Sequence, residues 1–249
     1  MKTPISDRPQ SATRWTAAWL LSALIALPFT AHAGLNAGLA AYDKADYTTA
    51  LQELTPLADK GNAQAQYRLG KIFNLGQSVP PDKKVAAQWF HLAAQQGLAA
   101  AQGALGYLCL VGDGVSQNSD LALEWTRKAA QQGDATAQFN LSVMYGEAFG
   151  IQKKPAESLQ WLRKAADQRH TAALNALGAA YAKGQDGTPQ NPVLAYALFA
   201  TSAEKGDSAA AAAQKTLATG MSTKDLQAAK ALARKWKPGT SGVHADVHA

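Results

Sequence analysis

The sequence predicts an all-α protein, a solenoid of about six antiparallel helix pairs. The main observation is an internal repeat of 36 residues, which appears in several independent columns of the sequence. Three of these columns are Gly61, Gly97 and Gly133; Leu69, Leu105, Leu141 and Leu177; and Trp89, Trp125 and Trp161. The 216 residues from Gly34 onward hold six such periods. One helix pair cannot bury both of its apolar faces, so units of this kind are stable when they stack on copies of themselves.

The first 33 residues have the composition of a secretory signal peptide. Lys2, Arg8 and Arg14 form a basic start, residues 15–29 are almost wholly apolar, and Ala31-His32-Ala33 is a small-x-small cleavage site. The alternative is a membrane anchor, but a span needs roughly 20 apolar residues and this run is shorter. We therefore expect cleavage after Ala33, a periplasmic or secreted product, and no stable membrane anchor after cleavage.

From residue 34 to residue 236 the chain divides into successive helix pairs. A first pair is expected at about 35–60, and a last pair at about 207–236. Four full units lie between them: 62–97, 98–133, 134–169 and 170–206. The fourth unit is one residue longer, and the extra residue falls in the stretch from Gly184 to Pro189, where a loop tolerates insertion.

Each full unit contains the signals of two helices. In the first unit, apolar residues from Asn62 to Leu75 recur at spacings of three and four, which draws one stripe along a helix. Glycine and prolines from Gly76 to Pro81 predict a turn. Asp82 stands where the second helix needs an N-cap, and Gly97 stands where that helix should end.

The same signals recur in the later units and change in the last pair. Residues placed to begin second helices are Asn118 and Asn191 as N-caps and Pro155 and Pro192 in the first turn. In the last pair, Gln214 replaces the repeat leucine, and Ser222 with Asp225 resembles a capping box. This pair is predicted to be a terminal cap with a solvated outer face. The tail, 237–249, lacks an apolar period and is predicted to be disordered.

These residues carry a resemblance to a known family. The run 65–70, Ala-Gln-Tyr-Arg-Leu-Gly, followed by Gly76, Trp89 and 93–97, Ala-Ala-Gln-Gln-Gly, resembles the Sel-one-like repeat, a relative of the tetratricopeptide repeat. The resemblance covers roughly residues 35–236. It implies a right-handed α-α superhelix that serves protein–protein interaction and assembly, and it implies no catalytic residues.

Composition and motifs favour a non-enzymatic protein. A net charge of +4 over the residues from Gly34 onward is mild, so no nucleic acid partner is expected. The sequence lacks the common hydrolase and phosphate-binding motifs, and its histidines are scattered, so no catalytic residue, metal site or cofactor is predicted. Some exported proteins with the similar repeat are β-lactamase-like, which leaves an envelope hydrolase as an alternative. Those proteins carry a cysteine pair in each unit, whereas this chain has only Cys109, in a core position.

The expected function is that of an exported scaffold or adaptor that binds a partner protein or peptide. In tetratricopeptide-like folds the first helices line the concave face. The positions there outside the buried stripe are Gln64, Tyr67, Lys71, Asn74, Tyr107, Leu110, Phe139, Val143, Asn175 and Lys183. Aromatic and amide side chains together suit an extended peptide. Two alternatives stay open: the aromatic residues pack between adjacent first helices, or they stack on cell-wall glycan.

Overall fold

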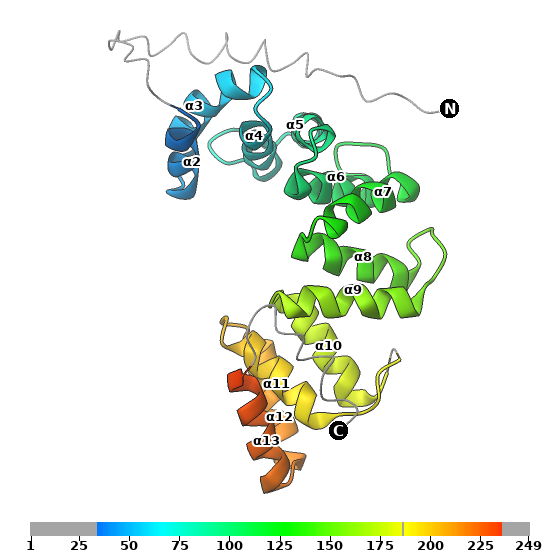
Figure 1. Ribbon diagram of the computed structural model, residues 1–249. Coiled ribbons are helices and arrows are strands. Elements are labelled where there is room, and N and C mark those ends of the chain that lie inside the picture. Colours follow the sequence, from blue (N-terminus) through cyan, green and yellow to red (C-terminus); the bar gives the residue numbers. More distant parts are fainter. Residues whose placement is uncertain (1–33, 186, 236–249) are drawn as a thin grey trace. The chain divides into compact units, whose positions relative to one another are not determined.

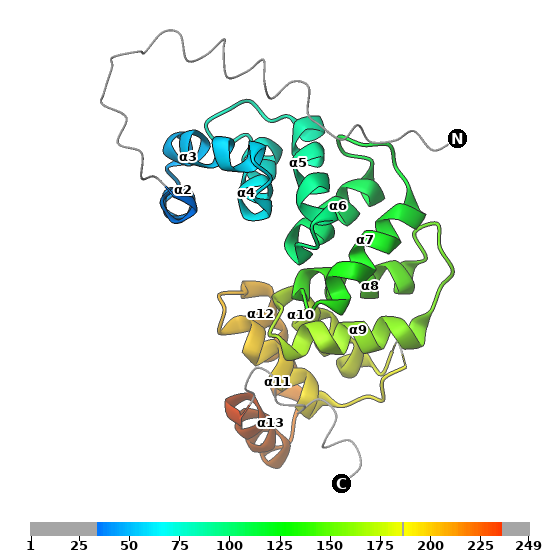
Figure 2. The same ribbon diagram turned by 45° about the horizontal axis from the view of Figure 1, so that its top comes forward.

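The structure is a computed structural model, and it describes residues 34–185 and 187–235. Within these residues it contains twelve helices and no strand, as the repeat predicts. They pack as consecutive antiparallel pairs, which Figures 1 and 2 show from two directions. The predicted signal peptide, 1–33, and the predicted tail, 237–249, lie outside the described residues. The described residues divide into two compact units, with the boundary between residues 129 and 130.

The first unit holds the early helix pairs. Its helices are α2 (Leu35–Asp43), α3 (Tyr47–Asp59), α4 (Ala63–Leu75), α5 (Lys83–Gln95), α6 (Ala99–Val111) and most of α7 (Ser119–Gln131). From α2 to α6 each helix packs against the next one along the chain. One buried cluster between them is aliphatic with one tryptophan, and its largest members are Leu54, Leu69, Ile72 and Trp89. Burial of this apolar stripe, with its spacing of three and four residues, holds α4 against its neighbours.

The second unit holds the later pairs. Its helices are α8 (Ala135–Glu147), α9 (Pro155–Asp167), α10 (Thr171–Lys183), α11 (Pro192–Ala203), α12 (Ser208–Gly220) and α13 (Thr223–Lys235). Helices α8 to α12 each pack against the next, and α13 packs against α11. The core includes Leu174, Leu177, Tyr181 and Leu198, all fully buried. Leu198 therefore fills the position that tryptophan occupies in the earlier units, one residue late.

Most helix starts follow the predicted caps. The side chains of Asp82, Asn118 and Asn191 each accept a hydrogen bond from a backbone N–H in the first turn of the following helix. The Ser222 hydroxyl likewise accepts a hydrogen bond from the backbone N–H of Asp225, at 3.1 Å. It also donates to the Asp225 carboxylate, which differs from the usual capping box, where a glutamate reaches back to the backbone.

Two features of the repeat depend on glycine. Gly97 and Gly133 follow the second helices with φ of 87° and 94°, a region that favours residues without a Cβ. Gly70 lies so close to α5 that a Cβ there would come within 2.6 Å of the Phe90 ring. The glycine therefore allows the bulky Phe90 to pack directly against the backbone of α4.

The last helix pair is a partial departure from the pattern. Ala210 of α12 and Ala229 of α13 are the buried residues of these two helices, and their other residues are exposed or half-buried. Ala229 packs with Tyr196 and Ala200 of α11. The final pair therefore has few buried residues and a mostly solvated surface.

Candidate partner-binding surface

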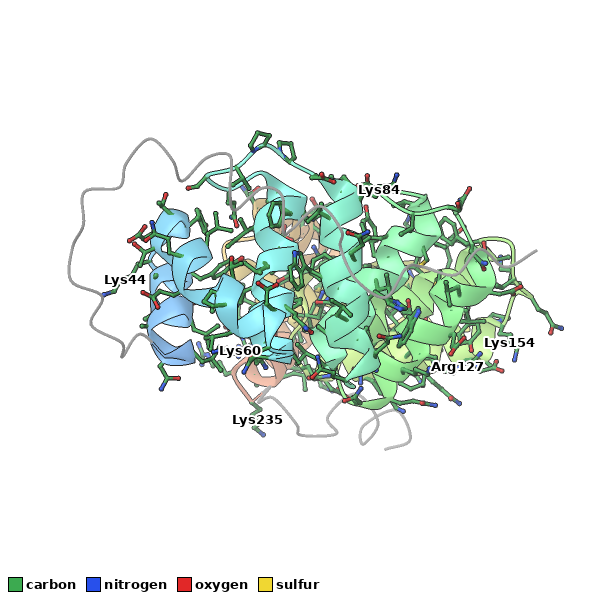
Figure 3. All side chains as sticks on the ribbon, turned by 90° about the horizontal axis from the view of Figure 1, so that it is seen from above. Lys44, Lys60, Lys84, Arg127, Lys154 and Lys235 are labelled. Atoms are coloured by element: carbon green, nitrogen blue, oxygen red, sulfur yellow. The ribbon has the colours of Figure 1, made fainter. Side chains whose placement is uncertain are left out.

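The first helices α4 and α6 contain no Asp or Glu, and their charged residues are Arg68 and Lys71. The second helix α5 likewise has two cations and no carboxylate, whereas α7 has two acidic and two basic residues. Figure 3 labels Lys84 on α5 and Arg127 on α7, which are both exposed. Among these four helices, only α7 carries carboxylates.

Helices α4 and α6 are joined through the ends of α5. Lys83 Nζ, at the start of α5, donates to Asn74 Oδ1 of α4 at 3.1 Å and lies 3.3 Å from Asp113 Oδ2, just after α6. Gln96, just after α5, donates from Nε2 to Gln66 Oε1 of α4 at 2.7 Å. Because the repeat unit recurs, residues that are 36 apart on these two first helices occupy equivalent positions on one face of the repeat.

A cluster of aromatic and cationic side chains lies on this face at α2 and α4. The Arg68 guanidinium carbon is 4.6 Å from the centre of the Tyr42 ring, and Lys71 Nζ is 5.6 Å from the same ring. Both cations also lie about 6 Å from the Tyr67 ring, at 5.9 and 6.0 Å. Arg68 is paired with Asp43 at 3.8 Å. Contacts of cations with aromatic faces hold the long side chains in place while their charge stays available.

Exposed apolar side chains continue the face from this cluster. Among the described residues, the large hydrophobic side chains that are most exposed include Leu75 at 58%, Tyr107 at 53% and Val111 at 46%. Leu75 and Val111 occupy the same repeat position at the ends of α4 and α6, and Tyr107 is one turn before Val111. We call the set Tyr42, Tyr67, Arg68, Lys71, Leu75, Tyr107 and Val111 the first-helix patch.

The predicted site residues of the first unit fall into two groups. Gln64 and Tyr107 are exposed, and Tyr67 and Lys71 are half-buried members of the patch. Asn74 and Leu110 have structural contacts: Asn74 accepts the hydrogen bond from Lys83, and the carbonyl of Leu110 accepts one from Gln117. Tyr67 packs on Phe90 with ring centres 5.8 Å apart.

In the second unit, several of the predicted site residues make contacts within the protein. Phe139 stacks on His170 with ring centres 5.1 Å apart. Asn175 Nδ2 donates to Asp207 Oδ2 at 2.6 Å. The pKa of Asp207 lies below its ordinary value, first because the backbone N–H of Ala210 donates to its carboxylate and then because Asn175 does. Val143 is half-buried, and Lys183 is exposed at the end of α10.

Four members of the patch were not predicted from the sequence: Tyr42, Arg68, Leu75 and Val111. A signal for two of them was present, since Leu75 and Val111 are apolar residues at one repeat position outside the buried stripe. Tyr42 and Arg68 meet only in the folded chain, because one comes from α2 and the other from α4.

The described residues show few features of a metal-binding or catalytic site. No group of three His, Cys, Asp or Glu side chains in this part of the chain could hold a metal ion, and no helix in it is long and apolar enough to cross a membrane. Cys109 is buried, and burial raises the pKa of its thiol to about 11. A thiol in this state is a core side chain with very little thiolate at neutral pH.

Comparison with known proteins identifies the repeat. A family model for the Sel1 repeat matches residues 63–98, 99–134, 135–170 and 171–207, which together make up more than half of the chain. The chain belongs to the Sel1 repeat family. The matched segments agree within one residue with the four units that the sequence predicted. Folds of this type typically serve as scaffolds for protein interaction.

Solved structures of Sel1 repeat proteins are similar to this chain. The crystal structure of a Sel1 repeat protein from Oxalobacter formigenes is 35% identical, with a TM-score of 0.62 over 70% of this chain and 68% of that one. A protective antigen of uropathogenic Escherichia coli with an SLR fold is 27% identical, with a TM-score of 0.63 over 74% of this chain and 41% of that one. Among curated proteins, none matches the chain.

Proposed function

We propose that this Sel1 repeat protein is an exported, non-catalytic scaffold or adaptor that binds a partner protein or peptide in the bacterial envelope through its first helices. The observation that carries the proposal is the first-helix patch, where Leu75, Tyr107 and Val111 are exposed on two adjacent helices. Exposed apolar side chains that gather on one face gain free energy when a partner covers them.

The distribution of charge supports the same face. A surface that serves solubility alone carries mixed charges, as α7 does. Helices α4 and α6 carry aromatic, aliphatic and amide side chains with two cations and no carboxylate. Tyrosine offers a large contact area and loses little conformational entropy on binding, and amides can bond to a peptide backbone. This composition fits a contact surface for protein.

The export part of the proposal is based on the sequence of residues 1–33. It is tested by fractionating cells that produce the chain and by determining the amino terminus of the product. We expect the protein in the periplasmic or extracellular fraction, beginning at Gly34. A product that keeps residues 1–33 and stays in the cytoplasm would contradict the export part of the proposal and leave the binding part standing.

The binding part is tested by photocrosslinking. A photoreactive phenylalanine analogue replaces Tyr107 in the patch, and in a matched protein it replaces Lys84, which is exposed on α5. We expect a discrete crosslinked protein species from position 107 and none from position 84. Equal crosslinking from both positions, or none from position 107, would contradict a binding role for this face.

Two other functions are tested with the same purified protein. A β-lactamase-type hydrolase would be acylated by a labelled penicillin, and we expect no label. A cell-wall glycan binder would sediment with purified peptidoglycan and would lose this property in a Tyr67→Ala, Phe139→Ala double variant. Sedimentation that depends on these two residues would favour the glycan over a protein partner.

A further inference from the structure

The first-helix patch combines three properties that together restrict its partner. It has two cations at one end, apolar side chains at the other, and no Asp or Glu on the helices α4 and α6 that support most of it. Arg68 is already paired with Asp43 on α2, at 3.8 Å. Lys71 has no ion pair within the described part of the chain and lies over Tyr42. The patch therefore has an excess positive charge centred on Lys71.

The other charged groups near the patch do not cancel this excess. Asp113, which follows α6, lies 3.3 Å from Lys83 and is neutralised by it. Lys83 itself also donates to Asn74, so this pair serves to join α4 to α6. Asp43 faces Arg68, and its side chain is 65% exposed. Among these groups, Lys71 is the cation that is free to meet a charge from outside the chain.

We propose that the first-helix patch binds an extended peptide segment that carries both an acidic side chain and a large apolar side chain. The acidic group pairs with Lys71, and the apolar group covers Tyr107 and Val111 on the neighbouring helix. This inference rests on the proposed function and adds the chemistry of the partner to it.

The electrostatic part of the interaction gives it selectivity. A lysine supported by an aromatic ring attracts a carboxylate and disfavours a basic segment, since no acidic residue of α4 or α6 offers a competing site. Contact between charges at a partly exposed site weakens with salt, because ions screen it. The apolar part, which buries Tyr107, is not screened in this way.

The test is a selection from a random library of 12-residue peptides displayed on phage, with the purified full chain as the target. Binding of synthetic copies of the enriched peptides is then measured for the wild type and for Lys71→Gln, Tyr107→Ser and the control Lys84→Gln. Lys71, Tyr107 and Lys84 are at least partly exposed, so the variants should fold normally, which thermal unfolding verifies.

We expect the enriched peptides to share Asp or Glu together with Leu, Ile, Phe, Tyr or Trp. Lys71→Gln should weaken binding about fivefold and remove most of its salt dependence, Tyr107→Ser should weaken it about tenfold, and Lys84→Gln should have no effect. Enriched peptides without acidic residues, whose binding still needs Tyr107, would overturn this inference and leave the proposed function intact. Binding that is unaffected by Tyr107→Ser would overturn both.

Discussion

The side-chain amide of Gln168 donates a hydrogen bond from Nε2 to Oε1 of Gln138, at 2.8 Å. Gln138 is buried, and its own Nε2 donates to the carbonyl of Ala130 at 3.2 Å. Gln168 also donates to the carbonyl of Gly133, at 2.9 Å. Through these bonds, Gln138 joins α8 to the end of α7, and Gln168 joins the end of α9 to α8. The same arrangement occurs in the first unit, where Gln96 donates to Gln66.

We predict that both glutamines stabilise the fold and that their contributions to the free energy of unfolding are coupled. Gln138→Ala should lower the free energy of unfolding by about 1–3 kcal/mol, because it removes two hydrogen bonds and leaves a gap in a buried place. Gln168→Ala should cost about 1 kcal/mol. The double variant should cost less than the sum, with a coupling of at least about 0.5 kcal/mol, since the residues are in direct contact. Urea unfolding of the four proteins measures this, and strict additivity would contradict it.

A second prediction concerns Ala148, which ends α8 with a φ of 65°. The corresponding residues in the other units are Gly76, Gly112 and Gly184, all with positive φ. An alanine is strained in this conformation, so Ala148→Gly should raise the free energy of unfolding by about 1 kcal/mol.

The reciprocal control is Gly112→Ala. It should destabilise by about 1 kcal/mol or more, because it introduces the same strain and also brings a Cβ to 3.1 Å from the Gln117 Cβ. Thermal and urea unfolding of both variants provide the measurement. A loss of stability in Ala148→Gly would show that the methyl group of Ala148 contributes more through packing than its backbone strain costs.

The third prediction concerns pH and His170. Its Nδ1 accepts a hydrogen bond from the backbone N–H of Ala173 at 3.4 Å, so the ring caps α10 in its neutral form. The pKa of His170 is lowered from its ordinary value of 6.5, first by burial and then by the nearby Lys205, while Asp134 opposes the shift. The folded state therefore binds this proton less well than the unfolded state does. The stabilisation is present above pH 6.5 and is lost as the pH falls through the lowered pKa.

A matched variant isolates this effect from other titrating groups. His170→Asn keeps a capping side chain, as Asn62 does in the first full unit, but it does not titrate. We expect the melting temperature of the wild type to fall more than that of His170→Asn between pH 8 and pH 5. Parallel curves for the two proteins would show that His170 is not the responsible group.

The fourth prediction concerns the thiol of Cys109. Burial raises its pKa from 9.0 to about 11, so at pH 8 the thiolate fraction is roughly a hundredfold lower than for an ordinary thiol. A thiol-reactive reagent should therefore modify the native chain at least about a hundredfold more slowly than the chain in urea. Because the raised pKa favours the neutral form in the fold, its contribution to stability is present below pH 9 and is lost as the pH rises. Equal reaction rates in both states would place the thiol at the surface.

The candidate site was only partly predictable from the sequence. Tyr67, Lys71 and Tyr107 were predicted, and the structure places them in one patch. Asn74 and Asn175 were predicted by the same reasoning, as positions outside the buried stripe, but their side chains bond to Lys83 and Asp207. These partners come from helix starts or loops that lie next to the asparagines only after the helices pack, so the repeat pattern gives no sign of them.

The family, the helix pairs and most helix ends can be recognised in the amino-acid sequence alone. The apolar spacing, the capping residues and the recurring glycines act within one turn or one repeat, so they can be recognised without knowing the fold. The packing of the helices, in contrast, sets which polar residues of the first helices bond within the protein and which of their cations have no ion pair in the described part of the chain. That choice depends on contacts between residues about 10–40 positions apart, such as Lys83 with Asp113 and Gln138 with Gln168, and local sequence does not encode such contacts.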